Sequence, residues 1–427
     1  MLLPFLPFML IVGVCAGVCG RAQAQSEPIT LLEDLKRVEA ARNSGTPTPG
    51  PDGVKAKAEA MALRAEAYLR GVQDACGGWA VNAKGPTFPA ISGLVLQGML
   101  LKPGSSEKDA AIAAGLAFVI SKQQEDGGIY DQILPSYNTA ICASALAKVG
   151  TPEAKAAVKK ALAFLRSIQY GEGAVSHEGL GESATPVDKD HPFYGGVGYG
   201  KHGRPDLSNT SFWVEALRDC GVEPGDAAFQ RAVVFLQRTQ MLEAAGGMKV
   251  NEMEYAKGSQ QGGFIYSTSV NKDDRGGGQS NAPTFEETLS DGTTASRLRS
   301  YGSMTYAGFK SYLYAGLKKD DPRVVAARGW IAANYTLEEN PGVGTDGMYF
   351  YMLVFAKAMD AFGEPSIEVK TAGGAAEVRD WKADLVTRLA GLQNEDGSFR
   401  SIDDRWMENN PVLITAYALI ALREAAQ

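Results

Sequence analysis

The sequence contains few cysteines and few histidines, and this scarcity narrows the possible functions. Of its five cysteines, two lie in the apolar N-terminal segment, which leaves Cys76, Cys142 and Cys220. Three sparse thiols do not make a disulfide framework, so we interpret them as small buried apolar residues. Since there are also only three histidines, the sequence predicts neither a metal site nor a cofactor.

Positive charge is also in short supply. The 42 Lys and Arg are outnumbered by 49 Asp and Glu, and the resulting net charge of −7 argues against a nucleic-acid partner. A hydrophobic content of 45% and a charged content of 21% are typical of a globular protein with a substantial core. The partner that we consider is a small-molecule or lipid-like ligand. The sequence leaves the oligomeric state open.

Long apolar runs are confined to the N-terminus. Residues 2–18 are almost wholly apolar, and residues 22–24 (Ala-Gln-Ala) form a small-x-small cleavage pattern. We therefore expect residues 1–24 to be a secretory signal peptide and the protein to be secreted or periplasmic. An uncleaved anchor is the alternative, although the run is short for a membrane span. Residues 25–53, rich in proline and glycine near their end, are expected to be an N-terminal segment and linker.

One unit recurs from residue 54 to the C-terminus. It consists of a helix-like run, a glycine turn and a second apolar run, and it is clearest at 393–399 (Gln-Asn-Glu-Asp-Gly-Ser-Phe) and at 124–130 (Gln-Glu-Asp-Gly-Gly-Ile-Tyr). Looser copies begin at Gln73 and at Gln169. The pattern predicts six helical hairpins, each with an outer helix before the turn and an inner helix after it. We expect no strands between them apart from a small hairpin at 366–376.

Hairpins of this kind cannot bury their own apolar faces, so they must stack on their neighbours. Closing the stack into a ring removes both of its exposed ends. We therefore predict an all-α fold, an α/α toroid, over residues 54–427. An open superhelix of the tetratricopeptide or HEAT type is the alternative, but those repeats have more uniform periods than the spacing of roughly 45 to 95 residues found here.

The recurring pattern, aromatic-Leu-x-x-x-Gln-x-Gly-x-aromatic, resembles the QW-type repeat of prenyltransferases and of squalene or hopene cyclases. Gln73, Gln124, Gln169 and Gln393 carry it, together with Gly78-Trp79, Gly128-Ile129-Tyr130, Gly173 and Gly397-Ser398-Phe399. The chain is most similar to exported prenyltransferase/squalene-oxidase-repeat proteins, through segments 206–210 (Asp-Leu-Ser-Asn-Thr) and 347–351 (Gly-Met-Tyr-Phe-Tyr). In physical terms the glycines permit the turn, the glutamine can bond to the loop backbone, and the aromatic residue fills the gap between hairpins.

The catalytic motifs of that family are missing from the sequence. Class II cyclases use Asp-x-Asp-Asp, whereas 271–274 (Asn-Lys-Asp-Asp) lacks the first acid and 188–191 (Asp-Lys-Asp-His) lacks the last. Protein prenyltransferases hold zinc through Asp-x-Cys, and 74–76 (Asp-Ala-Cys) has that spelling but lies at a repeat turn. Whether the chain is an enzyme is therefore left open.

Every inner helix begins just after a turn, so we expect all six inner N-termini on one face of the ring, which we call the mouth. Helix N-termini favour polar or anionic ligands, and two long insertions also emerge there. The ligand-binding candidates at the mouth are His202, Arg204, Asp206, Asn209, Trp213, Tyr301, Tyr306, Asp346, Tyr349, Asp404 and Trp406. Further candidates are Tyr137, Asn138, Phe212, Arg299, Tyr351 and Arg405. Helix capping is the more ordinary role for Asp206, Ser208, Asn209 and Asp346, and a surface ion pair is the ordinary role for Asp404 and Arg405. For Tyr306, Tyr349 and Tyr351 the ordinary role is that of lining or core residues.

Three function hypotheses follow. The first is a terpene-cyclase-like protein that binds an isoprenoid-like or other apolar ligand in a central cavity. The second is a carbohydrate-active toroid, a glycosidase or polysaccharide lyase, that uses Asp206, Asp346 or Asp404 as acid or base. The third is a non-catalytic scaffold of the cell envelope. An apolar funnel in the ring centre would favour the first, a polar cleft with paired acids the second, and a filled centre the third.

Overall fold

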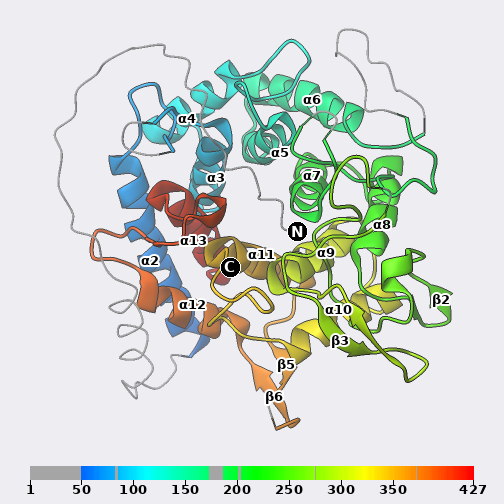
Figure 1. The fold of residues 1–427 in the computed structure, drawn as a ribbon. Helices are drawn as coiled ribbons and strands as arrows, with labels where there is room; N and C mark the ends of the chain where they lie inside the picture. Colours follow the sequence, from blue (N-terminus) through cyan, green and yellow to red (C-terminus); the bar gives the residue numbers. More distant parts are fainter. Residues whose placement is uncertain (1–49, 82–84, 173–185, 201–202, 275, 372) are drawn as a thin grey trace.

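The computed structural model describes residues 50–427 except 82–84, 173–185, 201–202, 275 and 372. In this part of the chain twelve α-helices alternate between an outer and an inner ring (Figure 1). The outer helices are α2 (Pro51–Gly71), α4 (Ala110–Ser121), α6 (Pro152–Ser167), α8 (Ala227–Thr239), α10 (Pro322–Ala333) and α12 (Trp381–Leu392). The inner helices are α3 (Pro89–Leu100), α5 (Pro135–Leu146), α7 (Leu207–Asp219), α9 (Gly302–Tyr314), α11 (Met348–Phe362) and α13 (Pro411–Ala425). The six predicted helical hairpins are confirmed, and the first begins three residues earlier than expected.

The inner helices close into a ring. Each packs against the next, from α3 through α5, α7, α9 and α11 to α13, and α13 returns to α3. In the outer layer α12 packs against α2, which also contacts α13. The first and last hairpins therefore lie side by side (Figure 1). The predicted α/α toroid is confirmed, and the open superhelix is excluded.

The two rings differ in how their apolar residues are distributed. In α3 every residue except Leu100 is buried, and in α13 every residue from Val412 onward is buried. A helix that is apolar all round needs cover on every side, which an inner position supplies. In the outer helix α6 the buried residues recur at helical spacing on one face, among them Ala154, Ala157, Ala161 and Phe164.

Most outer helices begin at a side-chain cap. The carboxylates of Asp109, Asp226, Asp321 and Asp380 accept backbone N–H groups at the starts of α4, α8, α10 and α12. The Thr151 hydroxyl does the same for α6, with proline at the first helical position as predicted. These bonds satisfy donors that have no partner within the helix.

Five of the outer helices are each followed by a glutamine that bonds the hairpins together. Its side-chain amide donates to a carbonyl oxygen in the turn that it begins and to a carbonyl oxygen in the next outer helix of the ring. The side-chain amide of Gln73 donates to the carbonyl oxygens of Gly77 at 2.8 Å and Ala111 at 2.9 Å. Equivalent pairs of bonds are made by Gln123, Gln169, Gln240 and Gln393. The repeated motif is therefore a structural bond between hairpins.

Two details of the motif differ from the sequence prediction. In the second hairpin the bonding residue is Gln123, because the amide of Gln124 donates to carbonyl oxygens within its own turn instead. In the third hairpin the partner of Gln169 is Gly195, whereas Gly173 lies outside the described residues. A long insertion separates Gln169 from Gly195, so the linear pattern could not reveal their pairing.

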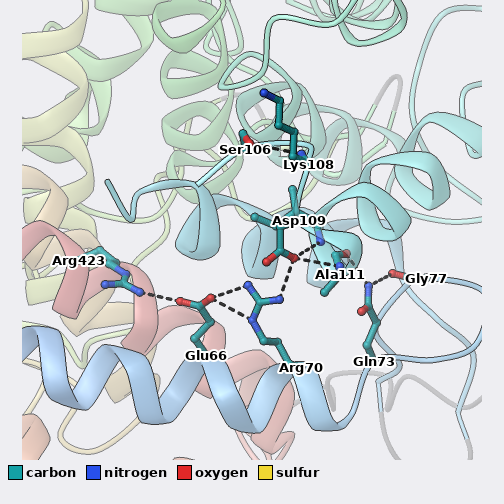
Figure 2. A network of polar contacts seen from close by, with 10 residues as sticks. Glu66, Arg70, Gln73, Gly77, Ser106, Lys108, Asp109, Ala111 and Arg423 are labelled. Carbon is teal, nitrogen blue, oxygen red and sulfur yellow. Dashed lines mark hydrogen bonds and ion pairs between the residues drawn. The ribbon is translucent and has the colours of Figure 1, made fainter. Parts of the chain in front are cut away.

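Ion pairs reinforce the joint where the ring closes (Figure 2). Arg423 of α13 donates to one oxygen of Glu66 on α2 at 2.7 Å, and Arg70 donates to the other oxygen, also at 2.7 Å. Arg70 continues to Asp109, the N-cap of α4, at 2.8 Å. One connected network therefore spans α13, α2 and α4, and it requires a closed ring.

Within the described ranges three two-stranded antiparallel hairpins lie between the helices, although the sequence predicted only the last of them. In the insertion before α9, β1 (Ala244–Ala245) pairs with β2 (Met248–Lys249), and β3 (Phe285–Thr288) pairs with β4 (Thr294–Arg297). The predicted hairpin at 366–376 is formed by β5 (Ile367–Lys370) and β6 (Ala376–Arg379). Short 3-10 helices occupy Glu254–Ala256 and Arg405–Met407.

The prediction that the cysteines are buried holds for only part of the set. Cys142 is buried and Cys220 is partly exposed, but Cys76 is exposed because it lies in the first interhelical turn. The expected signal peptide and nearly all of the expected linker fall outside the described residues. Among the residues that the structure does describe, no helix combines the length and apolarity of a membrane span.

Exchanging two neighbouring glutamines for alanine tests the bond between hairpins. We expect Gln123→Ala to lower the free energy of unfolding by about 1–3 kcal/mol, because two carbonyl oxygens, those of Gly127 and Ala157, lose their donor. Gln124→Ala is the matched control and is expected to cost less than about 1 kcal/mol, since it removes only bonds within one turn. Urea denaturation measures both, and equal losses would contradict the assignment.

Candidate functional site

The carboxylate of Asp206 is fully buried at the mouth of the ring. Asp206 is the N-cap of α7, where it accepts from the backbone N–H of Asn209 at 2.9 Å. The Asn209 amide and the Ser208 hydroxyl also donate to it, at 2.7–3.0 Å. Burial raises the pKa of Asp206, while these hydrogen bonds and the nearby Arg204 oppose the shift. The capping role expected for Asp206 is confirmed, and both of its oxygens are used in it.

Three tyrosines surround Asp206. Burial raises the pKa of Tyr199, Tyr266 and Tyr301, and the nearby Asp206 carboxylate raises each further. The guanidinium of Arg204 lies 5.3 Å from the centre of the Tyr266 ring. These residues come from the segments before α7 and before α9, so both long insertions contribute to this part of the mouth.

Four aromatic side chains cross the ring axis below the mouth, and we call Tyr137, Phe212, Phe350 and Tyr417 the aromatic layer. Their contacts form a closed cycle. The ring centres lie 5.3 Å apart for Tyr137 and Phe212, 6.0 Å for Phe212 and Phe350, and 6.2 Å for Phe350 and Tyr417. The Tyr417 and Tyr137 hydroxyls are 3.2 Å apart. Because α7 and α11, like α5 and α13, are not neighbours in the ring, these contacts fill its centre at this level.

Closer to the C-terminal ends of the inner helices, a second set of side chains crosses the axis. We call Gln97, Glu215, Lys310 and Lys357 the ionic layer. Glu215 forms ion pairs with both lysines, and Lys357 also donates to Gln97 at 3.1 Å. Burial alone would raise the pKa of Glu215, but the two ammonium groups hold it below its usual value. All four side chains belong to residues that are buried, so this layer is sealed from solvent and joins α3, α7, α9 and α11.

Exposed large apolar side chains are concentrated in the segments that lead into the inner helices. The described part of the chain has nine exposed large apolar residues, and six of them lie in segments that lead from an outer to an inner helix: Ile133, Tyr199, Val270, Ile402, Trp406 and Met407. The three described non-glycine residues with positive φ also lie there, namely Leu134, Trp406 and Met407 at 54°, 55° and 66°. Strained backbone and exposed apolar surface on the same face are typical of a binding surface.

The structure brings most of the predicted residues to the mouth. Arg204, Asp206, Asn209, Tyr301 and Asp346 lie in, or just before, the first turn of an inner helix. Asp404 and Trp406 lie further from α13, in the segment that precedes it, and the Trp406 ring lies against Gly347 at the start of α11. Tyr301 is almost fully buried and accepts from the amide of Asn281 at 2.9 Å. His202 lies outside the described residues.

Three of the ligand-binding candidates are core residues, which was the ordinary interpretation of Tyr306 and Tyr349 but not of Trp213. Trp213 is fully buried and donates to the carbonyl oxygen of Leu165 on α6 at 2.8 Å, so it faces the outer ring. Tyr306 is buried with its ring centre 5.0 Å from that of Phe355. Tyr349 is buried against Phe399, with 5.9 Å between ring centres. Inner helices are apolar all round, so an aromatic residue there often faces the core.

The predicted roles of Asp346 and Asp404 are also wrong. The N-cap of α11 is Gly347, at φ 66°, and Asp346 instead forms an ion pair with Arg405, the residue that was expected to pair with Asp404. The start of α11 is capped by Glu408, whose carboxylate accepts from two backbone N–H groups. Sequence reasoning missed Glu408 because it lies far from α11 along the chain.

The ionic layer was missed as well, although the sequence carries a signal for it. Glu215, Lys310 and Lys357 are isolated charges within otherwise largely apolar inner helices. A charge at such a position is expensive to bury without a partner, so three of them in one ring indicate a shared cluster.

Three of the carboxylates at the mouth are already engaged, whereas Asp404 is exposed. Asp206 caps α7, Glu408 caps α11, and Asp346 pairs with Arg405. In the described ranges no three side chains of His, Cys, Asp or Glu lie together as a metal site would require. The geometry of the described mouth therefore suits binding through apolar contact better than acid–base chemistry.

Comparisons with known proteins agree on the fold. Residues 83–261, somewhat under half of the chain, match the family model of the squalene-hopene cyclase C-terminal domain. An inactive variant of the α-1,6-mannanase GH76A of Salegentibacter sp. HEL1_6, solved with α-1,6-mannotriose, is 6% identical with a TM-score of 0.52, covering 87% of this chain and 99% of that one. The type II terpene cyclase MstE from Scytonema, solved with geranylgeranyl dihydroxybenzoate, is 13% identical with a TM-score of 0.46, covering 88% and 98%. No curated relative matches. At these identities the likeness concerns the fold alone.

Proposed function

Because residues 83–261 match the model of the squalene-hopene cyclase C-terminal domain, we propose that the protein binds an isoprenoid-like, largely apolar ligand at the mouth of its ring. The main support is the concentration of exposed apolar side chains in the segments that lead into the inner helices. The sequence-based hypothesis located the ligand in the ring centre. The aromatic and ionic layers fill that centre, which is the outcome expected of a non-catalytic protein. The proposal therefore keeps the apolar ligand of the first hypothesis, assigns no reaction, and places the site above the aromatic layer.

The rim of the mouth connects to the aromatic layer through contacts between rings. Tyr199, which is 38% exposed, has its ring centre 6.1 Å from that of Tyr137 in the aromatic layer. Apolar surface thus runs from the rim to the floor of the proposed site. Covering one large apolar side chain contributes about 1.5–3 kcal/mol at most, so a ligand that covers two or three of them would bind appreciably.

The carbohydrate-active alternative is less well supported. Glycosidases need two available carboxyl groups flanking the bond that they cleave. At this mouth Asp206 and Glu408 are buried and serve as helix caps, while Asp346 is paired with Arg405. The likeness to the mannanase concerns the fold. The proposal therefore assigns binding, without a reaction.

Titration with a defined ligand tests the proposal. We expect geranylgeraniol to bind the purified protein saturably in calorimetry, and α-1,6-mannotriose not to bind. The double variant Ile133→Ala/Tyr199→Ala removes two exposed rim side chains and should weaken geranylgeraniol binding by tenfold or more, which corresponds to a loss of about 1.4 kcal/mol or more.

A matched control separates the rim from apolar surface in general. Leu63 and Val325 are exposed to a similar degree, at 47% and 52%, but lie on outer helices. Leu63→Ala/Val325→Ala should leave the affinity unchanged. Equal weakening by both double variants, no binding of geranylgeraniol, or binding of mannotriose instead would overturn the proposal.

A further inference from the structure

The segment from residue 401 to residue 410, which we call the strap, lies across the start of α11 just before the chain enters α13. Arg405 pairs with Asp346 immediately before the helix. The Trp406 ring covers Gly347 so closely that a Cβ there would lie 2.8 Å from Cε3 of the ring. Glu408 accepts from the backbone N–H groups of Tyr349 at 3.2 Å and Phe350 at 2.8 Å. Three successive contacts therefore hold the strap on one helix end.

The backbone of the strap opposes these contacts. Trp406 and Met407 have φ values of 55° and 66°, in the left-handed region that side chains other than glycine rarely adopt. Both side chains are also exposed, at 44% and 41%, so burial contributes little to hold them. A strained conformation persists only where its surroundings enforce it. Here those surroundings are mainly the contacts of Arg405, Trp406 and Glu408 with α11.

We propose that the strap is a clasp that opens and closes over the mouth, and that Glu408 is the positioning residue that couples this motion to proton binding. Opening would free Trp406 from Gly347 and uncover the start of α11, where Phe350 belongs to the aromatic layer. The regulation of ligand access by the clasp rests on the proposed function. The opening of the strap does not depend on it.

The direction of the coupling follows from where Glu408 lies. Burial raises the pKa of Glu408 to about 7, and Asp403 of the strap contributes in the same direction, while the N–H groups of Phe350 and Tyr349 oppose it. Tyr417 of α13 faces Glu408 as well. In an open strap Glu408 would meet water and return towards its ordinary value of 4.5. The closed state therefore holds the proton more tightly, and rising pH favours the open state.

Neutral Glu408 is compatible with the closed strap. Its carbonyl oxygen can still accept the shorter bond, from the N–H of Phe350, and no charge is then buried. Above neutral pH the same group carries a buried negative charge with no cation bonded to it among the described residues. The strap is thus expected to be closed at acidic pH and to open increasingly as the pH rises through 7.

Quenching of tryptophan fluorescence by acrylamide tests the clasp in the full chain without ligand. Of the five tryptophans, Trp406 is 44% exposed while the other four are at most 9% exposed, so Trp406 reports the accessible signal. If the open state has an ordinary carboxyl pKa, the opening equilibrium should rise roughly 30-fold between about pH 5.5 and about pH 8.5. We expect quenching to increase over this range with a midpoint near pH 7, and Trp406→Phe should remove the change.

Two variants make the test specific. Glu408→Gln should make the quenching independent of pH, whereas Asp403→Asn should keep the transition and lower its midpoint, because Asp403 raises the pKa of Glu408. Arg405→Ala loosens the strap without touching Glu408 and should raise quenching at every pH. The clasp is overturned if the wild type shows no transition, or if Glu408→Gln keeps it.

Repeating the geranylgeraniol titration at both pH values tests the regulatory role separately. We expect tighter binding at the higher pH in the wild type and equal binding in Glu408→Gln. If the wild type binds geranylgeraniol with the same affinity at both pH values, the regulatory role is wrong. The opening of the strap would not be contradicted by that result. Failure of geranylgeraniol to bind at either pH would count against the proposed function and not against the clasp, which the quenching measures alone.

Discussion

Replacing Glu215 with alanine is expected to lower the free energy of unfolding by about 3–5 kcal/mol, the largest loss that we anticipate from a single side chain. Glu215 pairs with Lys310 and Lys357, and all three residues are at most 5% exposed. Without the carboxylate, two ammonium groups would remain close together in an interior that offers them no other anion in contact. Denaturation by guanidinium chloride at neutral pH measures the loss.

A triple replacement provides the control for this prediction. Exchanging Glu215, Lys310 and Lys357 together for methionine removes the charges and keeps most of the volume, so it should restore much or all of the stability lost in Glu215→Ala. Recovery would show that the loss comes from uncompensated charge. A loss below about 1 kcal/mol in Glu215→Ala would contradict the role of the ionic layer in joining the inner helices.

The second large effect is expected at the turn of the third hairpin. Gly195 has φ 83°, and a Cβ at this position would lie 1.8 Å from the carbonyl oxygen of Arg231 on α8. Gly195→Ala should therefore cost more than about 3 kcal/mol, because the left-handed backbone and the clash with backbone atoms act together. Thermal or chemical unfolding measures the loss, and failure to accumulate folded protein would agree with it.

Gly104 is the matched control because it separates the two causes. Its φ of 81° is nearly the same, but a Cβ there would meet nothing within 4 Å. Gly104→Ala should cost only about 1–2 kcal/mol, the price of the left-handed conformation. If both variants lose the same stability, then close approach between hairpins is not what the turn glycine provides.

The repeat was predictable from the sequence as a pattern, but the residues that pair within it were not. The recurring glutamines and glycines predicted helical hairpins and a ring, because residue types that permit a turn and bond to its backbone recur with the pattern. Which residues actually pair depends on geometry in space. Gln123 was confused with Gln124 since the two are adjacent, and the pairing of Gln169 with Gly195 was hidden by an insertion.

The candidate site was predictable in position but less so in detail. The mouth follows from chain direction, since every inner helix begins after a turn, and Asp206 was recognised as a cap from its place before α7. Trp213 was placed at the mouth and not in the core because sequence periodicity does not tell which side of a helix that is buried all round faces the axis. Glu408 could not be recognised, since its partners are backbone groups of another hairpin.

The sequence by itself determined the all-α class, the six hairpins and the closure of the ring, because helical periodicity and turn chemistry are local and the burial of apolar faces admits few arrangements. Tertiary structure alone decided what fills the ring. The aromatic and ionic layers combine single side chains from inner helices that are distant in the chain, and their contacts arise only after closure. The strap owes its contacts to the packing of the last hairpin on the fifth, which brings the segment before α13 against the start of α11.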